Sequence, residues 1–230
     1  MRIGIVGAGA IGATLARGWA QVGHEIAIAN SRGPASLTEL SALPGIEAVE
    51  IGEVAAGREV IVVSIPLIAV PTLPAGLLAA AAGAVVIDTC NYYPRERDGR
   101  IAEIEEGMVE SRWVERQLGH PVVKTFNTID SAYLGGMGLP PGSPGRIALP
   151  VAGDEPEAKA TAMALVDQLG FDPVDSGPID ESWRHQPGAP SYEIEVGADE
   201  LRVALAAASP ERPERQRATA ASPGSFENPR

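Results

Sequence analysis

The sequence predicts an α/β fold with a doubly wound, mostly parallel sheet and a small C-terminal extension. Three observations lead to this prediction. Short β-branched runs recur along the chain, segments with helical patterning separate them, and several of the runs are hydrophobic throughout. Strands that are apolar on both faces are typical of a parallel sheet covered by helices on both sides. The alternation of strands and helices indicates repeated βαβ units.

Seven clear runs and one weaker run predict strands. The clear runs span residues 3–6, 25–29, 47–49, 60–64, 85–88, 122–126 and 147–151, and the weaker one spans 171–174. Helices are expected at residues 10–22, 35–43, 73–82, 155–169 and 199–207. The fourth of these begins at "GDEP", with acidic residues in its first turn, and ends at Gly170, as a capped helix does.

The composition changes towards the C-terminus. A loop with aromatic residues, "SWRHQPGAPSY", precedes the last expected helix, and the final stretch "SPERPERQRATAASPGSFENPR" is polar, rich in Pro and Arg, and without periodicity. Such a stretch offers little apolar surface to bury. We therefore expect one α/β domain over residues 1–176, an extension packed on it at 177–208, and a mobile tail at 209–230.

The bulk composition restricts the function. The 230 residues are 45% hydrophobic and carry a net charge of −12, which opposes binding to nucleic acids and anionic membranes. The chain has a single cysteine, Cys90, and no Cys/His cluster with metal-ligand spacing, so no metal site is expected. The first residues enter a strand pattern directly, and the sequence predicts a cytoplasmic protein with no membrane partner.

The N-terminal stretch contains a Gly-x-Gly-x-x-Gly motif. It consists of Gly7, Ala8, Gly9, Ala10, Ile11 and Gly12, directly after an apolar strand and at the start of a helix. In this context Gly7 permits a tight turn, Gly9 lets the backbone approach a pyrophosphate, and Gly12 lets the helix pack on the strand. The helix N-terminus then faces the phosphates. The motif predicts a Rossmann-like, dinucleotide-binding fold.

The residues after the second expected strand indicate which dinucleotide binds. An NAD site places Asp or Glu there, on the adenosine ribose 2′-OH. This chain has Asn30, Ser31 and Arg32 instead. A neutral pair followed by a guanidinium can hydrogen-bond and neutralise a 2′-phosphate, whereas an acid would repel it. We therefore expect NADP(H) as the cofactor.

Polar residues also follow the other strands, at the edge where parallel sheets bind ligands. Ser64, Ile65 and Pro66 are expected along the ribose and diphosphate, and Thr89, Asn91, Asn127 and Thr128 near the nicotinamide. These residue types also cap helices and close turns, so a structural role is the alternative for each, and Asp88 in particular can brace a loop.

No Ser/His/Asp or paired-carboxylate arrangement stands out, so no catalytic residue is assigned. The segment 183–192, with Trp183 and His185, is expected to border the pocket of a second substrate. Aromatic rings beside Pro and Gly suit a stacking wall for a planar ligand. An ordinary packing loop is the alternative interpretation.

The stretches "MRIGIVGAGAIGATLARGWAQVGHEIAIANSRGP", "VIVVSIPL", "VVIDTCNYY", "VVKTFNTI" and "ESWRHQPGAPSY" together resemble the coenzyme F420-dependent NADP oxidoreductases and their bacterial relatives. The resemblance covers most of residues 1–195. It implies one Rossmann-like domain, usually in a homodimer, that passes a hydride between NADPH and a deazaflavin. It also implies a phosphate loop at Gly7 to Gly12 and a 2′-phosphate clamp at Ser31 and Arg32.

Direct hydride transfer requires mainly that two rings be stacked and water be excluded, so little acid–base apparatus is expected. The predicted co-substrate is a small-molecule acceptor, F420 or a flavin. A reductase of ferric or other small molecules is an alternative, as is a hydroxyacid or imine reductase, although Lys159 is the only lysine after Gly153. A non-catalytic NADPH sensor is the alternative outside the enzymes.

Overall fold

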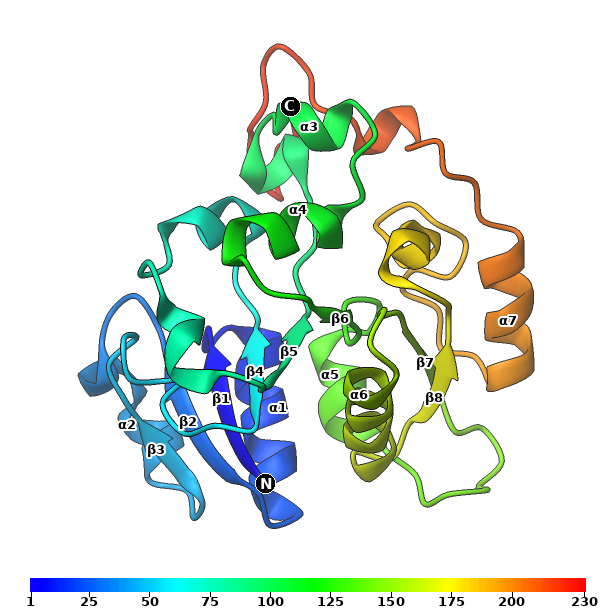
Figure 1. Cartoon of the computed structure of the whole chain (residues 1–230). Coiled ribbons are helices and arrows are strands. Elements are labelled where there is room, and N and C mark those ends of the chain that lie inside the picture. Colours follow the sequence, from blue (N-terminus) through cyan, green and yellow to red (C-terminus); the bar gives the residue numbers. More distant parts are fainter.

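Six parallel strands form the central sheet of the computed structural model, which describes residues 1–230 (Figure 1). They are β1 (Arg2–Val6), β2 (Glu25–Ala29), β3 (Ile46–Ala48), β4 (Val60–Val63), β5 (Val85–Asp88) and β6 (Val123–Lys124). Their order across the sheet is β3-β2-β1-β4-β5-β6, and every neighbouring pair is parallel. This is the strand order of dinucleotide-binding folds, so the predicted fold class is confirmed.

The last two predicted strands form a sheet of their own. β7 (Ala148–Val151) and β8 (Asp172–Asp175) pair in parallel, beside the main sheet. An antiparallel bridge joins the two sheets, because the Lys124 N–H donates to the Ala152 carbonyl at 2.8 Å and the Ala152 N–H donates back at 3.0 Å. All eight predicted strands therefore exist, but only six continue one sheet.

Seven α-helices accompany the strands. They are α1 (Ala10–Gln21), α2 (Thr38–Ser41), α3 (Ala102–Glu105), α4 (Glu110–Leu118), α5 (Ser131–Gly136), α6 (Pro156–Gln168) and α7 (Ala198–Ala206). Alternate residues of the central strands enter two different cores, as the period of a strand requires. Val60 and Val62 join the core with α1 and α6, while Ile61 and Val63 join the core with α4 on the opposite face.

Three predicted helices, at 10–22, 155–169 and 199–207, are confirmed to within two residues as α1, α6 and α7. The prediction for residues 73–82 is wrong, because two 3₁₀ helices, Leu67–Thr72 and Leu77–Ala81, form the crossover instead. Prolines at 71 and 74 and the left-handed Gly76 break the α-helical hydrogen-bond ladder there. The expected helix at 35–43 is divided into a 3₁₀ turn, Pro34–Leu37, and the short α2.

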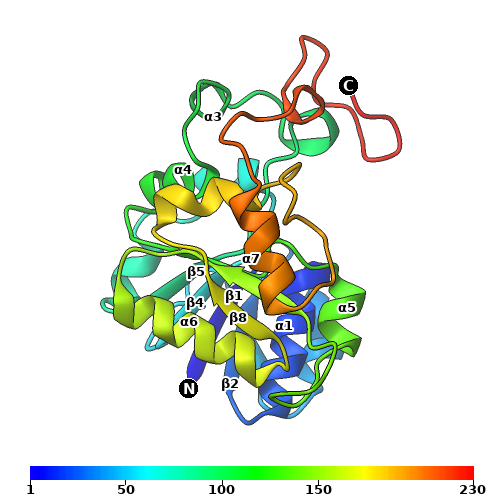
Figure 2. The same cartoon turned by 90° about the vertical axis from the view of Figure 1, so that its right-hand side faces the viewer.

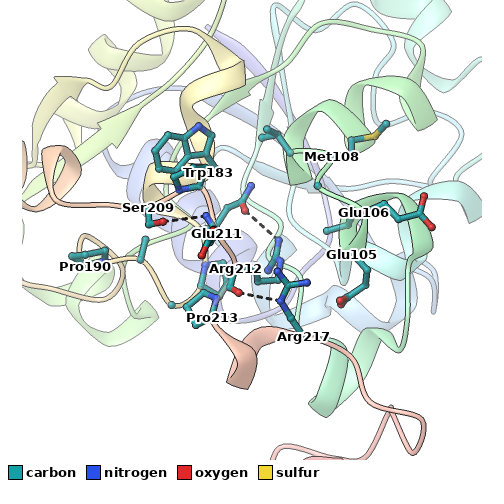
Figure 3. Close-up of a pocket in the computed structure, with 18 of the residues that line it drawn as sticks. Glu105, Glu106, Met108, Trp183, Pro190, Ser209, Glu211, Arg212, Pro213 and Arg217 are labelled. Carbon is teal, nitrogen blue, oxygen red and sulfur yellow. Dashed lines mark hydrogen bonds between the residues drawn. The ribbon is translucent and has the colours of Figure 1, made fainter.

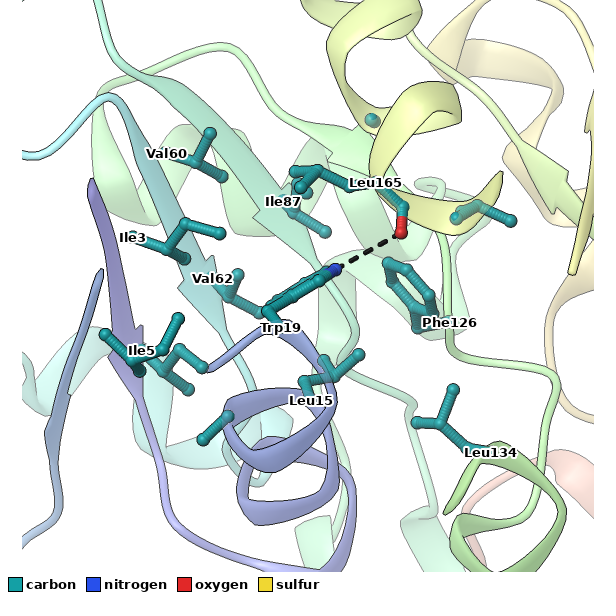
Figure 4. Close-up of a cluster of buried hydrophobic side chains, with 14 of the residues drawn as sticks. Ile3, Ile5, Leu15, Trp19, Val60, Val62, Ile87, Phe126, Leu134 and Leu165 are labelled. Carbon is teal, nitrogen blue, oxygen red and sulfur yellow. Dashed lines mark hydrogen bonds between the residues drawn. The ribbon is translucent and has the colours of Figure 1, made fainter. Parts of the chain in front are cut away.

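The Trp19 side chain of α1 contacts both α6 and the segment after β6 (Figure 4). Its side chain is fully buried, and its ring meets the Phe126 ring edge-on, with centroids 5.6 Å apart. The indole N–H donates to the Leu165 carbonyl at 3.2 Å, near the C-terminus of α6, where helix carbonyls lack internal partners. One side chain of α1 thus positions α6 and the segment after β6.

The C-terminal part covers the second sheet (Figure 2). Leu201 and Leu205 of α7 pack against Ala148 and Val174. Beyond α7, Arg212 Nη2 donates to Glu110 Oε1 at 2.7 Å. The domain limits and the mobility expected of residues 209–230 stay predictions. No helix of the chain combines the length and the apolar character that crossing a bilayer requires.

His185 fastens this C-terminal part to the main sheet. The imidazole is fully buried, with Nδ1 3.1 Å from Asn127 Oδ1 and Nε2 3.3 Å from Ser176 Oγ. Burial lowers the pKa of His185 from 6.5 to about 3, and the positive charge of Lys124 acts in the same direction. The folded protein therefore holds this ring in its neutral form.

We expect the buried ring to make stability depend on pH. The unfolded chain binds the His185 proton below about pH 6.5 and the folded chain only near pH 3, so the free energy of unfolding falls as the pH drops between these values. The loss from pH 7 to pH 5 is about 2 kcal/mol for this one group. Urea unfolding at several pH values measures it.

The comparison variants are His185→Gln, which removes the titrating group, and His120→Gln, which removes a half-buried loop histidine. The first variant should lose most of the slope between pH 7 and pH 5, and the second should retain it. An unchanged slope in His185→Gln would show that the buried imidazole does not cause the dependence.

Candidate dinucleotide-binding groove

A groove of about 390 Å³ lies at the carboxyl edge of the central sheet, beside the glycine loop. Segments that are distant in sequence meet there. Its lining includes nine residues predicted from the sequence, namely Gly9, Ala10, Ile11, Ser64, Ile65, Pro66, Thr89, Asn91 and Asn127. Cys90, Tyr93, Arg97, Phe126, Ile129, Asp130, Ser131, Tyr192 and Glu193 complete it. The structure thus gathers most of the predicted residues around one space.

At two of the three motif glycines, neighbouring backbone atoms leave no room for a Cβ atom. Gly7 has a φ of 108°, and a Cβ there would lie 2.1 Å from the Ser64 carbonyl oxygen. A Cβ on Gly12 would lie 2.0 Å from the Gly7 carbonyl oxygen. Only glycine fits at either position. These contacts confirm the tight-turn role of Gly7 and the helix-packing role of Gly12, and Ala8 lies between them outside the groove lining.

Gly9 differs from its two partners, because a Cβ built on it meets no atom within 4 Å. The space in front of Gly9 is the groove. The first backbone hydrogen bond of α1 runs from the Ala13 N–H to the Gly9 carbonyl at 2.9 Å, so the N–H groups of the three residues between them have no backbone acceptor. An open glycine face beside free helix N–H groups fits a pyrophosphate.

The predicted 2′-phosphate clamp lies at the end of β2, outside the groove lining. The Asn30 side chain organises this loop, because Oδ1 accepts the Arg32 N–H at 2.9 Å and Nδ2 donates to Ser36 Oγ at 2.9 Å. Ser31 and Arg32 are exposed. The Gly7 N–H donates to the Ala29 carbonyl at 2.8 Å, which holds the loop next to the glycine motif.

Asn91 and Asn127 are hydrogen-bonded mainly to the protein. Asn91 Nδ2 donates to the Asn127 carbonyl at 2.8 Å and to the Tyr192 hydroxyl at 3.2 Å. Asn127 Nδ2 donates to Asn91 Oδ1 at 3.1 Å and to the His185 carbonyl at 2.7 Å. The side-chain N–H groups of both residues are therefore used in hydrogen bonds that hold the groove wall together. Thr128 is buried and does not line the groove. Contacts of these residues with a nicotinamide stay predictions.

Asp88 and Lys124 form a fully buried ion pair below the groove, with Lys124 Nζ 3.1 Å from Asp88 Oδ2. Asp88 also accepts from the Cys90 N–H at 2.8 Å and from Ser111 Oγ at 2.8 Å, and Lys124 Nζ also donates to the Cys90 carbonyl. Asp88 therefore braces the loop after β5. Burial and the Asp88 charge raise the pKa of the Cys90 thiol well above its usual value, so this cysteine is an uncharged part of the wall.

Sequence reasoning did not identify Tyr93, Arg97 and Phe126 as lining residues of the groove. Tyr93 and Arg97 follow the same strand end as Asn91, so the rule that ligands bind beyond strand ends could have found them a few residues further on. Tyr192 belongs to the segment 183–192 that was expected to border the pocket, whereas no local signal pointed to Glu193. Phe126 enters the lining through a φ of 60°, which turns the chain directly after β6.

The segment 183–192 divides between two cavities. Tyr192 borders the groove, but Trp183 lines a separate cavity of about 490 Å³ (Figure 3). That cavity lies between residues 104–109 and the C-terminal residues 207–217, and Arg212 and Arg217 contribute to its wall. Only the end of the predicted segment therefore adjoins the glycine loop.

The family model described as NADP oxidoreductase, coenzyme F420-dependent, matches residues 2–92. Among curated proteins, YjhV of Escherichia coli (strain K12) is 61% identical over 54 residues, which are 24% of this chain and 39% of that protein. The chain thus spans about two fifths of the length of this relative.

Two solved structures share 27% sequence identity with the chain. The protein SMa0349 from Sinorhizobium meliloti has a TM-score of 0.71, with 85% of this chain and 94% of that chain covered. A protein from Arthrobacter sp. FB24, provisionally assigned as an F420-dependent NADP reductase, has a TM-score of 0.60, with 78% and 86% covered.

An imine reductase from Myxococcus stipitatus shares the fold at 16% identity and a TM-score of 0.58, with 78% of this chain and 55% of that chain covered. The matched segment 2–92 contains β1 to β5, the glycine loop and the ends of β4 and β5 that line the groove. Over these residues, the chain is similar to the coenzyme F420-dependent NADP oxidoreductases.

Proposed function

We propose that the protein transfers a hydride between NADP(H) and a planar redox acceptor in the groove. One observation carries this proposal, namely that two sets of groups share one groove. The first set is the open face of Gly9 with the free N–H groups at the start of α1, and the second is a wall of amide and tyrosine side chains. The first set of groups suits a diphosphate, and the second suits the polar edge of a ring system.

NADPH bound along this groove supplies a hydride from C4 of its nicotinamide. The glycine loop holds the diphosphate, and Arg32 reaches the 2′-phosphate from the end of β2. Ser64, Ile65 and Pro66 line the path between the loop and the end of β5. The wall built by Asn91 and Asn127 keeps the second ring system at the same end of the groove.

The acceptor class follows from the space and from the relatives. A groove with Phe126, Tyr93 and Tyr192 in its lining favours a flat conjugated molecule. The family description and the Arthrobacter protein both refer to coenzyme F420. We therefore propose a deazaflavin or flavin as co-substrate. The homodimer that the resemblance implies stays a proposal as well.

Gly9 provides a test of the phosphate site that is separate from folding. Gly9→Ala adds a methyl group that meets no protein atom, so the melting temperature should change by less than about 2 °C. The methyl group occupies the diphosphate path, so NADPH affinity should fall at least about tenfold, a loss of about 1.4 kcal/mol. Fluorescence titration with NADPH measures this loss.

Gly12→Ala is the matched variant, because its methyl group would meet the Gly7 carbonyl oxygen. That variant should lose stability as well as affinity. If Gly9→Ala binds NADPH as tightly as the wild type, the diphosphate does not lie against the glycine loop.

Arg32 provides the test of cofactor choice. A charge-assisted contact with phosphate contributes roughly 1.5–3 kcal/mol, so Arg32→Ala should weaken NADPH binding about 10- to 100-fold and leave NADH binding nearly unchanged. Asn30→Asp should shift the preference further towards NADH, because the carboxylate repels the phosphate and can accept from a free 2′-OH.

Asp at position 30 keeps the oxygen that accepts the Arg32 N–H, so this loop should retain its shape. Titration of both cofactors against both variants decides the question. Equal losses for NADPH and NADH in Arg32→Ala would mean that the arginine supports the loop without contacting the phosphate.

The function itself is tested by NADPH oxidation with F420, FMN and a ferric chelate measured side by side. We expect the two planar acceptors to be reduced with a kcat at least ten times that for the chelate. Faster reduction of the chelate would favour a ferric reductase. Tight NADPH binding without turnover of any acceptor would favour an NADPH sensor.

A further inference from the structure

Two tyrosine hydroxyls meet in the wall of the groove. Tyr93 follows the end of β5, and Tyr192 comes from the C-terminal extension, yet their hydroxyl oxygens are hydrogen-bonded to each other. Asn91 Nδ2 donates to the Tyr192 oxygen at 3.2 Å. Both tyrosines line the groove and are half-buried. The proposed hydride transfer uses the rings of this pair as groove lining and gives the two hydroxyls no role in the reaction.

Either hydroxyl of the pair could be the donor, and we assign Tyr192 as the donor. Because Tyr192 accepts from Asn91, its own O–H is polarised and becomes the better donor of the two hydroxyls. With Tyr192 donating to Tyr93, the Tyr93 oxygen is an acceptor within the pair, and its proton has no protein acceptor. The Glu193 carboxylate beside Tyr192 competes for the Tyr192 proton, but it is exposed to solvent, which weakens this hydrogen bond. With the assigned direction, the chain Asn91 to Tyr192 to Tyr93 ends in the Tyr93 O–H.

The surroundings hold the Tyr93 ring in place and keep it protonated. The Arg97 guanidinium carbon lies 5.2 Å from the ring centroid, and Arg97 Nη2 donates to the Asn91 carbonyl at 2.7 Å. The Phe226 ring packs edge-on against Tyr93 with centroids 5.5 Å apart. Burial is the largest cause that raises the pKa of Tyr93 and of Tyr192, so both remain neutral donors at pH 7.

We propose that Tyr93 donates a hydrogen bond to the hydride acceptor, and that Tyr192 and Asn91 hold its hydroxyl in position. This inference rests on the proposed function and deepens it. The substrate class is a flat conjugated molecule with a carbonyl oxygen or ring nitrogen that gains negative charge when another atom of its conjugated system takes the hydride. Tyr93 stabilises that charge as it develops.

The atoms and electrons of this step balance. NADPH gives up a hydride and becomes NADP⁺, and one new bond to hydrogen forms on the acceptor, a C–H bond on a deazaflavin or an N–H bond on a flavin. The electron pair displaced from the conjugated system moves onto the acceptor oxygen or nitrogen, where it meets the Tyr93 O–H. Solvent then supplies the proton that completes the reduced product, and Tyr93 keeps its own.

The test compares Tyr93→Phe with Tyr133→Phe in the full chain. Tyr133 is an exposed tyrosine on α5, outside the groove. In Tyr93→Phe the kcat with F420, FMN or menadione should fall about 10- to 100-fold, since removal of one preorganised donor costs up to about a thousandfold in a dry site. The NADPH dissociation constant should change less than about twofold, because the lost donor faces the acceptor.

A double-mutant cycle separates a positioning role from a structural one. Tyr192→Phe should lower kcat about 3- to 10-fold, because it releases the Tyr93 hydroxyl without removing it. The double variant should be no slower than Tyr93→Phe alone, since Tyr192 acts only through Tyr93. The phenylalanine ring retains the packing on Arg97 and Phe226, so both variants should melt within a few degrees of the wild type.

Three outcomes would overturn this inference. A kcat within twofold of the wild type in Tyr93→Phe would remove the donor role and leave the proposed function standing. Losses that multiply in the double variant would mean that the two tyrosines act separately. A wild type that binds NADPH but reduces none of the three acceptors would overturn the proposed function and this inference together.

Discussion

The buried ion pair of Asp88 and Lys124 supports the wall of the groove that lies opposite the glycine loop. Both side chains are fully buried, and removal of one partner from such a pair leaves an uncompensated charge that costs several kcal/mol. Asp88 ends β5 and holds the Cys90 N–H, while Lys124 ends β6 and holds the Cys90 carbonyl. The pair thus fixes the loop that carries Thr89, Asn91 and Tyr93.

The same lysine also joins the two sheets. Its backbone forms the antiparallel bridge to Ala152, so the position of β7 and β8 depends on the residue that neutralises Asp88. The C-terminal extension packs on this second sheet and presents the His185 carbonyl to Asn127. The ion pair below the groove is therefore connected, through the second sheet and the extension, to the hydrogen bonds in the groove wall.

The two halves of the groove have different physical origins. The glycine loop is mostly a local structure, because Gly7 has a φ of 108° and Gly12 is required by the Gly7 carbonyl, although the Ser64 carbonyl after β4 also crowds Gly7. The opposite wall is assembled from residues up to 101 positions apart, such as Asn91 and Tyr192.

Local patterns determined much of this protein. Apolar runs of β-branched residues predicted all eight strands, and the glycine spacing predicted the phosphate loop, because both signals depend on neighbours in sequence. Predictions failed where two prolines and a left-handed glycine turned residues 73–82 into 3₁₀ helices. They also failed to separate β7 and β8 from the main sheet, because strand propensity does not state which strands pair.

The residues of the candidate site also divide into those that the sequence predicted and those that only the tertiary structure brought together. The glycine motif predicted three residues of the groove lining, and the strand-end rule predicted six more, among them Ser64, Thr89 and Asn127, because parallel strands end at one edge. Only the tertiary structure brought Tyr192 to Tyr93, sent Trp183 to another cavity and paired Lys124 with Asp88. These contacts join distant parts of the chain, and their geometry is set by how the two sheets and the extension pack, which no short stretch of sequence encodes.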